Sequence, residues 1–194
     1  MIRNYFYVSR KLRSVIVHVS NWFSTLRCHL CVFGNPAISI ASNCSFGQNV
    51  SLRATDGGSI SLGRRVSLAA GVQIVTQGGR IVIADDVFIG VGAIIVSTES
   101  VQIGRDALIA EYVVIRDQDH STASRPVRLA GFHSSPVRIG NDVWIGCKAS
   151  ILRGASVGDR CVIGAHAVVR SAIPDDMLAV GIPARAIRHT EVGQ

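Results

Sequence analysis

Residues 139–169 read IGNDVWIGCKASILRGASVGDRCVIGAHAVV, and this stretch decides the fold of the chain. Its first position and every sixth position after it are aliphatic: Ile139, Ile145, Ile151, Val157, Ile163 and Val169. Glycine follows four of them, and a small or β-branched residue comes four residues after each of the first five. The stretch is therefore a repeat with a period of six, and a fixed period is the sequence signature of a solenoid.

A period of six fits neither of the common elements. An amphipathic helix needs apolar residues at spacings of three and four, whereas an ordinary strand alternates for a few residues and stops at a turn. Short strands joined by corners do fit, because the glycine after an aliphatic residue tolerates the backbone angles of a tight corner. Three strands and three corners close one coil of a triangular prism.

The same register runs backward through the chain as triplets of inward positions. They are Ile40, Phe46 and Leu52; Leu62, Leu68 and Ile74; Ile83, Ile89 and Ile95; and Ile103, Ile109 and Ile115. With the two C-terminal triplets they make six coils, a rod about 29 Å long at about 4.8 Å per coil. Between triplets the spacing exceeds six by four, three, two and eighteen residues, so every insertion falls at one corner. We expect function at this edge, where the longest insertion forms a protruding loop over residues 116–136.

Composition and charge narrow the class of protein. The length suits one domain with an appendage, and only 6% of the residues are aromatic, so aliphatic side chains must fill the core. The net charge of +7 comes without a dense basic run or interleaved aromatics, so nucleic acid is not an expected partner. Five Cys without a convincing secretory signal favour a reducing cytoplasm. No stretch approaches the roughly 20 apolar residues of a membrane-spanning helix.

Residues 1–33 precede the coils and follow a different pattern. Between residues 2 and 26 the apolar residues recur mostly at spacings of three and four, which predicts an amphipathic helix. Because the first 55 residues hold six basic residues and no acid, residues 1–27 could contact an anionic membrane surface. Alternatively, the helix caps the prism or packs between subunits. Residues 34–173 form the prism, and Pro174 and Pro183 predict that regular coils stop before a tail over residues 174–194.

Chemistry-bearing residues gather where the longest insertion begins. The polar run Asp-Gln-Asp-His occupies residues 117–120, and His120 has the side chain best suited to general base catalysis near neutral pH. Asp117 and Asp119 are candidates to orient its imidazole, as is a backbone carbonyl. The other His residues are scattered without ligand spacing, so no metal site is expected. Cys28 and Cys31 form a CxxC without a second pair. Cys147 follows a corner, where a packing or cofactor-lining role suits it better than that of a nucleophile.

The chain from about Ile81 to Arg188 resembles the hexapeptide-repeat acyltransferases, in the branch of the galactoside, maltose, xenobiotic and polysaccharide O-acetyltransferases. Residues 137–188 are similar to the C-terminal signature of that branch, and LIAEYVVIRDQDH, residues 108–120, is similar to the segment that ends in its catalytic His. The resemblance implies a left-handed parallel β-helix, all β apart from the N-terminal helix. It also implies a homotrimer with each active site between two prisms.

The resemblance assigns roles to individual residues. His120 would be the general base of direct acetyl transfer from acetyl-CoA to a hydroxyl, with Asp119 beside the acceptor and Trp144 as a wall of the cleft. Along the CoA path it implies Cys147, Ala165, Arg170, Arg185 and Arg188. Arginine suits phosphate because its planar fork pairs with two oxygens. A solvated basic tail is the alternative for the three arginines.

Two positions depart from the galactoside-acetylating members. Those members carry Asn where this chain has Gly90, and an acidic acceptor contact where it has Thr98. We keep Gly90 in the acceptor site and expect a small-molecule or oligosaccharide acceptor other than a galactoside, in surface polysaccharide biosynthesis on the cytoplasmic side of the membrane. Acetylation of a xenobiotic such as an antibiotic, and a non-catalytic β-helix scaffold, remain alternatives.

Overall fold

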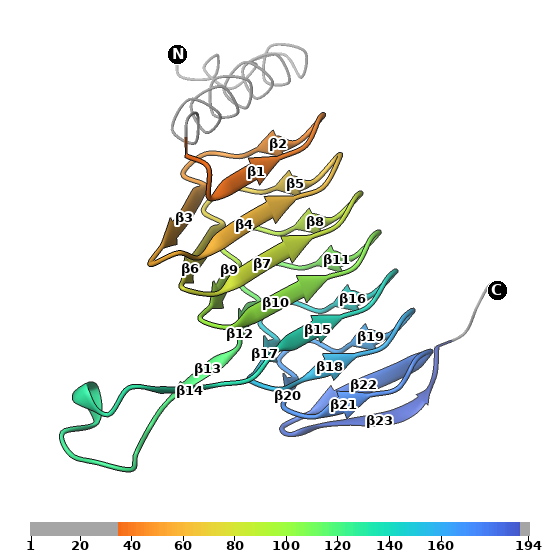
Figure 1. Cartoon of the computed structure of the whole chain (residues 1–194). Coiled ribbons are helices and arrows are strands. Elements are labelled where there is room, and N and C mark those ends of the chain that lie inside the picture. Colours follow the sequence, from red (N-terminus) through yellow and green to blue (C-terminus); the bar gives the residue numbers. More distant parts are fainter. Residues whose placement is uncertain (1–34, 191–194) are drawn as a thin grey trace, which may run out of the picture.

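A computed structural model describes residues 35–190 as a triangular β-helix of three sheets (Figure 1). The first sheet holds β1 (Ile38–Ile40), β4 (Ser59–Leu62), β7 (Arg80–Ile83), β10 (Ser100–Ile103), β15 (Val137–Ile139), β18 (Ser156–Val157) and β21 (Ala172–Ile173). The second holds β2 (Ser45–Phe46), β5 (Ser67–Leu68), β8 (Phe88–Ile89), β11 (Leu108–Ile109), β16 (Trp144–Ile145), β19 (Val162–Ile163), β22 (Met177–Gly181) and β23 (Ala184–His189). The third holds β3 (Ser51–Thr55), β6 (Gln73–Gln77), β9 (Ile94–Ser97), β12 (Val114–Arg116), β17 (Ser150–Ile151) and β20 (Val168–Val169).

The coils are left-handed and parallel, and six of them are complete, which confirms the predicted fold class. The inward positions of neighbouring coils lie in register, as where Ile115 of β12 pairs with Ile95 of β9 and Ile151 of β17. The side chains of Ile95, Ile115 and Ile151 are fully buried. Each buried aliphatic side chain contributes about 1.5–3 kcal/mol relative to exposure, so the stacked layers provide the main stabilisation of the rod.

The corner glycines serve a different purpose from the expected one. A Cβ atom on Gly146 would lie 2.6 Å from the backbone nitrogen of Ala165 in the next coil, so the absence of a side chain permits the close stacking of coils. The left-handed backbone falls two residues later, on residues such as Lys148 and Arg160, which both have φ 57°. Periodicity located the corners correctly, but their positive φ angles are not on these glycines.

The prism has three edges, which we name by what they carry. The ladder edge joins the first sheet to the second and includes residues 84–87 and 158–161. The far edge joins the second sheet to the third and includes residues 90–93, 146–149 and 164–167. The loop edge joins the third sheet to the first and carries the insertions.

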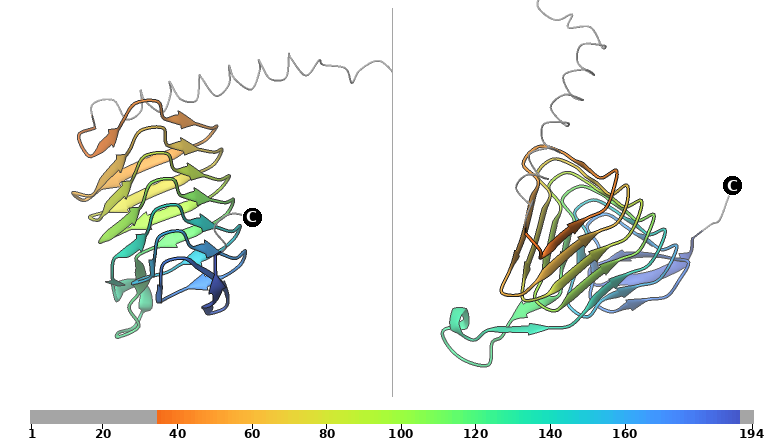
Figure 2. Two further views of the ribbon diagram at one scale, coloured as in Figure 1. Left: turned by 90° about the vertical axis from the view of Figure 1, so that its right-hand side faces the viewer. Right: turned by 45° about the horizontal axis from the view of Figure 1, so that its top comes forward.

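The longest insertion leaves the loop edge between β12 and β15, as predicted. It is a two-stranded antiparallel ribbon of β13 (Gln118–His120) and β14 (Phe132–Ser134), connected through the 3-10 helix η1 (Val127–Leu129). Figure 2 shows the ribbon projecting away from the prism, opposite the ladder edge.

The segment expected as a tail carries further regular structure. β21 starts a seventh coil by pairing in parallel with β18, β22 continues this coil on β19, and β23 then folds back antiparallel on β22. Pro174 and Pro183 lie between strands, where their missing N–H groups interrupt no ladder, so the boundary placed at residue 174 falls within this partial coil. The helix predicted for residues 2–26, the contact proposed for residues 1–27 and the Cys28–Cys31 pair lie outside the described residues.

Candidate active site

Asp117 anchors the root of the loop. Its side chain is fully buried, and its two carboxylate oxygens accept hydrogen bonds from the backbone N–H groups of Thr98 and Glu99, both at 2.9 Å. The Ser97 hydroxyl donates a third hydrogen bond at 2.6 Å. The three donors lie at the end of β9 and in the corner that follows it on the loop edge, so Asp117 fixes where the ribbon leaves the prism. Within residues 35–190 its oxygens accept hydrogen bonds from Ser97, Thr98 and Glu99 and none from the imidazole of His120.

Thr98 has a structural task at this corner. Its hydroxyl lies 2.6 Å from the Ser134 hydroxyl, which links β14 to the same corner that Asp117 holds. In this chain the position ties down the returning strand of the loop.

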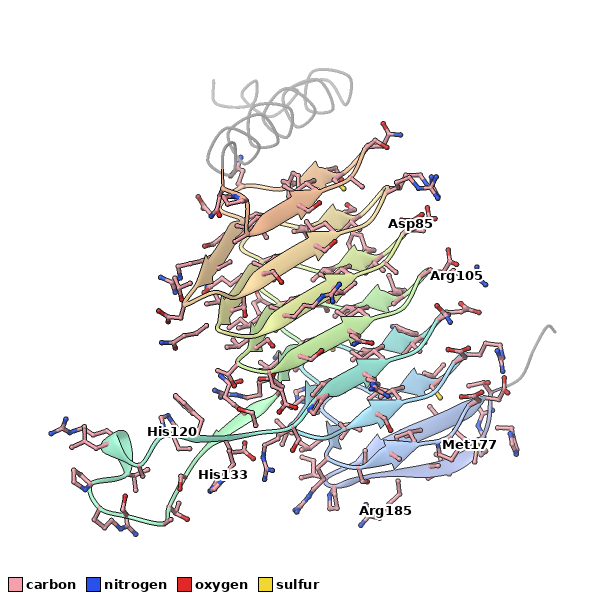
Figure 3. All side chains as sticks on the ribbon, in the orientation of Figure 1. Asp85, Arg105, His120, His133, Met177 and Arg185 are labelled. Atoms are coloured by element: carbon pink, nitrogen blue, oxygen red, sulfur yellow. The ribbon has the colours of Figure 1, made fainter. Side chains whose placement is uncertain are left out.

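His120 ends the first strand of the ribbon and is exposed. Its ring packs against Phe132 of β14, with ring centroids 4.5 Å apart and planes at 39°. Within residues 35–190 the imidazole nitrogens have no hydrogen-bond partner, so both are open to a substrate or a neighbouring chain. Figure 3 shows His120 and His133 on the ribbon, across the molecule from Asp85 and Arg105 at the ladder edge.

Asp119 points to the other face of the ribbon and forms an ion pair with Arg153. The Arg153 Nε atom lies 2.9 Å from Asp119 Oδ2. Both residues line a groove of about 420 Å³ together with Arg170, Leu152, Val168, Ile182 and Pro183. Asp119 and Arg170, two of the predicted site residues, therefore line the same groove. Asp119 directly precedes His120 in the chain.

Sequence reasoning missed Arg153. Its position in the repeat offered a signal, because residues 152–155 form the next corner of the loop edge after the insertion. An outward residue at that corner must lie beneath the loop. The periodicity could therefore have identified it, although not its partner.

Other predicted site residues lie on a different edge. Gly90, Cys147 and Ala165 occupy corners of the far edge, those of Cys147 and Ala165 in neighbouring coils and that of Gly90 two coils before Cys147. Trp144 lies on the outer face of the second sheet, where its side chain is 51% exposed between Leu108 and Val162. Within one chain, the third sheet separates this group from His120.

Arg185 and Arg188 lie on β23, at the C-terminal end of the prism, and both are exposed. Each guanidinium donates a hydrogen bond to a neighbouring carbonyl oxygen: Arg185 to Ala184 at 3.1 Å and Arg188 to His189 at 3.3 Å. The exposed Arg185 guanidinium therefore remains accessible for an anionic group.

Two further features concern the described residues alone. In residues 35–190, no His, Cys, Asp and Glu side chains gather in a group of three or more that could hold a metal ion. This part of the chain also contains no helix long and apolar enough to cross a membrane.

Comparison with known proteins identifies the family. The model described as bacterial transferase hexapeptide (six repeats) matches residues 136–171, and the hexapeptide repeat of succinyl-transferase matches residues 37–76 and 80–115. WbbJ of Escherichia coli, provisionally named a lipopolysaccharide biosynthesis O-acetyl transferase, is 36% identical over 141 residues, which cover 68% of this chain and 72% of WbbJ. The chain therefore belongs to the hexapeptide-repeat acyltransferase family.

One further relative resembles the chain in sequence, and one solved structure shares its fold. A Mycobacterium tuberculosis protein provisionally named an acetyltransferase is 37% identical over 161 residues, which cover 81% of this chain but only 54% of that protein. The chain thus spans about half the length of this curated relative. The crystal structure of the N-acyltransferase AntD from Bacillus cereus, in complex with dTDP and 3-hydroxybutyryl-CoA, superimposes with a TM-score of 0.71 at 18% identity, covering 85% of this chain and 88% of AntD.

Proposed function

We propose that this protein transfers the acetyl group of acetyl-CoA to a hydroxyl of a saccharide, with His120 as general base. The observation that carries the proposal is the position of His120, exposed on the ribbon at the edge where all insertions fall. Both its nitrogens are open within the described residues. Names of relatives such as WbbJ, an O-acetyl transferase, support the reaction class.

The proposed chemistry is a direct transfer. A sugar hydroxyl is a poor nucleophile at neutral pH, so one imidazole nitrogen of His120 removes its proton as the oxygen attacks the thioester carbonyl. The tetrahedral intermediate collapses with cleavage of the C–S bond, and the imidazolium returns its proton to the departing thiolate. Backbone N–H groups near a corner would stabilise the negative oxygen. The Phe132 ring limits rotation of the imidazole by packing against it.

Acetyl-CoA would bind through residues from two edges. Arg170 in the groove beside Asp119, with Arg185 and Arg188 on β23, would pair with its phosphate oxygens. Cys147 and Ala165 on the far edge would flank its pantetheine arm. Because the third sheet lies between these edges in one chain, we propose that a neighbouring chain supplies the second set.

We propose a homotrimer, the assembly that the sequence resemblance implies, and the geometry of the edges is compatible with it. The loop edge and the far edge border the third sheet, so a ring of three chains that joins these edges would turn the third sheet inward. Its outer face carries half-buried aliphatic side chains, among them Val75, Ile94, Val96, Val114 and Val168. An apolar face suits a subunit interface better than solvent.

We propose a role in surface polysaccharide biosynthesis on the cytoplasmic side of the membrane. WbbJ, named for lipopolysaccharide biosynthesis, supports this class of acceptor. Thr98, which is committed to Ser134, replaces the acidic acceptor contact of the galactoside-acetylating enzymes and argues against a galactoside.

The His120→Ala variant tests the mechanism. We expect its turnover to fall by about 10²–10⁴-fold, the usual contribution of a general base, while acetyl-CoA binding stays within about twofold. Thiol release from acetyl-CoA, measured against a panel of sugars, oligosaccharides and antibiotics, gives the rate and identifies the acceptor class. Unchanged turnover would exclude His120 as the base. Activity on antibiotics alone would indicate xenobiotic acetylation.

A further inference from the structure

The outer face of the first sheet carries a shallow groove of about 830 Å³ that the proposed mechanism does not use. Its floor is a column of outward positions on five neighbouring strands in register: Val82, Gln102, Arg138, Ser156 and Ala172. At about 4.8 Å per strand, the column is about 19 Å long. This length suits an extended chain better than a compact small molecule.

Two arginines bring unpaired positive charge to the groove. Arg80 begins β7 directly after the loop edge, and Arg138 follows Pro136, where the long loop returns to the prism. Both are exposed, and within residues 35–190 neither guanidinium has a hydrogen-bond or ion-pair partner. Gln102 is the register partner of Arg138, and its amide donates only a 3.5 Å bond to the Ser100 hydroxyl. The groove therefore offers free donors on the side that adjoins the loop.

The acids that line the groove lie at one side of it and have hydrogen-bond partners there. Asp159 accepts hydrogen bonds from the backbone N–H and the side-chain amide of Asn141, at 2.7 and 3.2 Å. The backbone bond is the main reason that the pKa of Asp159 lies below its usual range. Asp175 in turn accepts a hydrogen bond from the N–H of Asp159 at 3.0 Å. Both acids belong to the ladder edge, so they leave the loop-edge side of the groove cationic.

We propose that this groove binds an extended anionic saccharide, a chain with carboxylate or phosphate groups, and holds it alongside the loop that carries His120. The inference rests on the proposed function and specifies its acceptor class. Arg80 and Arg138 pair with the anionic groups through bidentate hydrogen bonds, while Gln102 and Ser156 bind sugar hydroxyls. Small residues such as Ala172 leave room for the rings.

Direct binding tests the groove independently of catalysis. The full chain with His120→Ala, without acetyl-CoA, is titrated with oligogalacturonates, phosphorylated mannan oligosaccharides and neutral maltooligosaccharides of matched length. We expect the acidic chains to bind more tightly than the neutral ones, with a Kd that falls with chain length and rises with salt. Adding Arg80→Gln and Arg138→Gln should raise the Kd for acidic chains about tenfold.

The control is Arg105→Gln, which removes one exposed charge from the ladder edge, outside the groove. This variant lowers the net charge of the protein by one. We expect its Kd for the acidic chains to stay close to that of the parent. Equal binding of neutral and acidic chains, an equal effect of the control and the double variant, or equally tight binding of a short DNA strand of the same charge would overturn the inference.

The same variants separate this inference from the proposed function. If acidic chains bind through the two arginines but no saccharide accepts an acetyl group, the groove assignment stands and the proposed function fails. If neutral saccharides are acetylated at full rate and the double variant binds acidic chains as well as its parent does, the proposed function stands and the groove assignment fails.

Discussion

At the residue scale, one carboxylate does work that its place in the sequence did not reveal. Asp117 is three residues before His120 and was a candidate to orient the imidazole. In the structure it is instead buried under the loop, where its two oxygens accept hydrogen bonds from the N–H groups of Thr98 and Glu99. Spacing along the chain cannot tell which way a side chain turns at a bend, and this limit explains the difference.

Asp117→Asn should destabilise the chain by about 1–3 kcal/mol, because the amide nitrogen would replace one acceptor oxygen and face a backbone N–H. Urea unfolding measures this loss. We also expect turnover to fall, because the ribbon that carries His120 loses its anchor. Asp119→Asn is the matched control, since its half-exposed ion pair with Arg153 should contribute less than about 1 kcal/mol. Equal losses of unfolding free energy in the two variants would contradict the anchoring role of Asp117.

At the scale of the element, the six-residue period predicted most of the fold. It located the inward positions, the three strands per coil and the single corner that takes the insertions, because each coil repeats the same packing problem. It did not predict β22 and β23, since no repeat marks the antiparallel return of the chain after Gly181. It also gave no warning of the ion pairs that link successive corners of the ladder edge.

Those corners should make the protein sensitive to acid. Hydrogen bonds from the backbone of Arg64 and from the side chains of Arg65 and Arg160 lower the pKa values of the Asp residues of the ladder, Asp85, Asp86 and Asp176. A carboxyl group with a lowered pKa in the folded state stabilises the fold above its unfolded pKa, about 3.9, and this contribution is lost as the pH falls through the folded value. We therefore expect the urea concentration at the midpoint of unfolding to be constant near neutral pH. It should decrease when the pH is lowered below about 4.

Asp86→Asn should weaken this acid dependence, because it removes a carboxylate that pairs with Arg65. Asp142→Asn is the control at an equivalent corner, since within residues 35–190 the Asp142 side chain has no hydrogen-bond partner. The urea midpoint could depend on pH in the same way in both variants and in the parent chain. That result would show that the ion pairs of the ladder edge do not cause the loss of stability in acid.

At the scale of the whole molecule, the predicted site residues divide between two edges. The sequence resemblance proposed which residues meet at the active site, but only the coil geometry shows that His120 and Cys147 lie on edges separated by the third sheet. Periodicity within one chain contains no information about its neighbours. The proposed trimer explains the division, because a ring places the loop edge of one chain beside the far edge of the next.

Mixing two inactive variants tests this arrangement. His120→Ala disables the loop edge, and Ala165→Trp should block the proposed CoA path at the far edge, where Ala165 is exposed. In randomly mixed trimers, about a quarter of the sites would combine an intact loop edge with an intact far edge, so up to about a quarter of the parent activity should return. The variants are unfolded and refolded together, and sedimentation must show the parent assembly for each variant alone. If every site lay within one chain, mixing would restore nothing, because each chain would still carry its own defect.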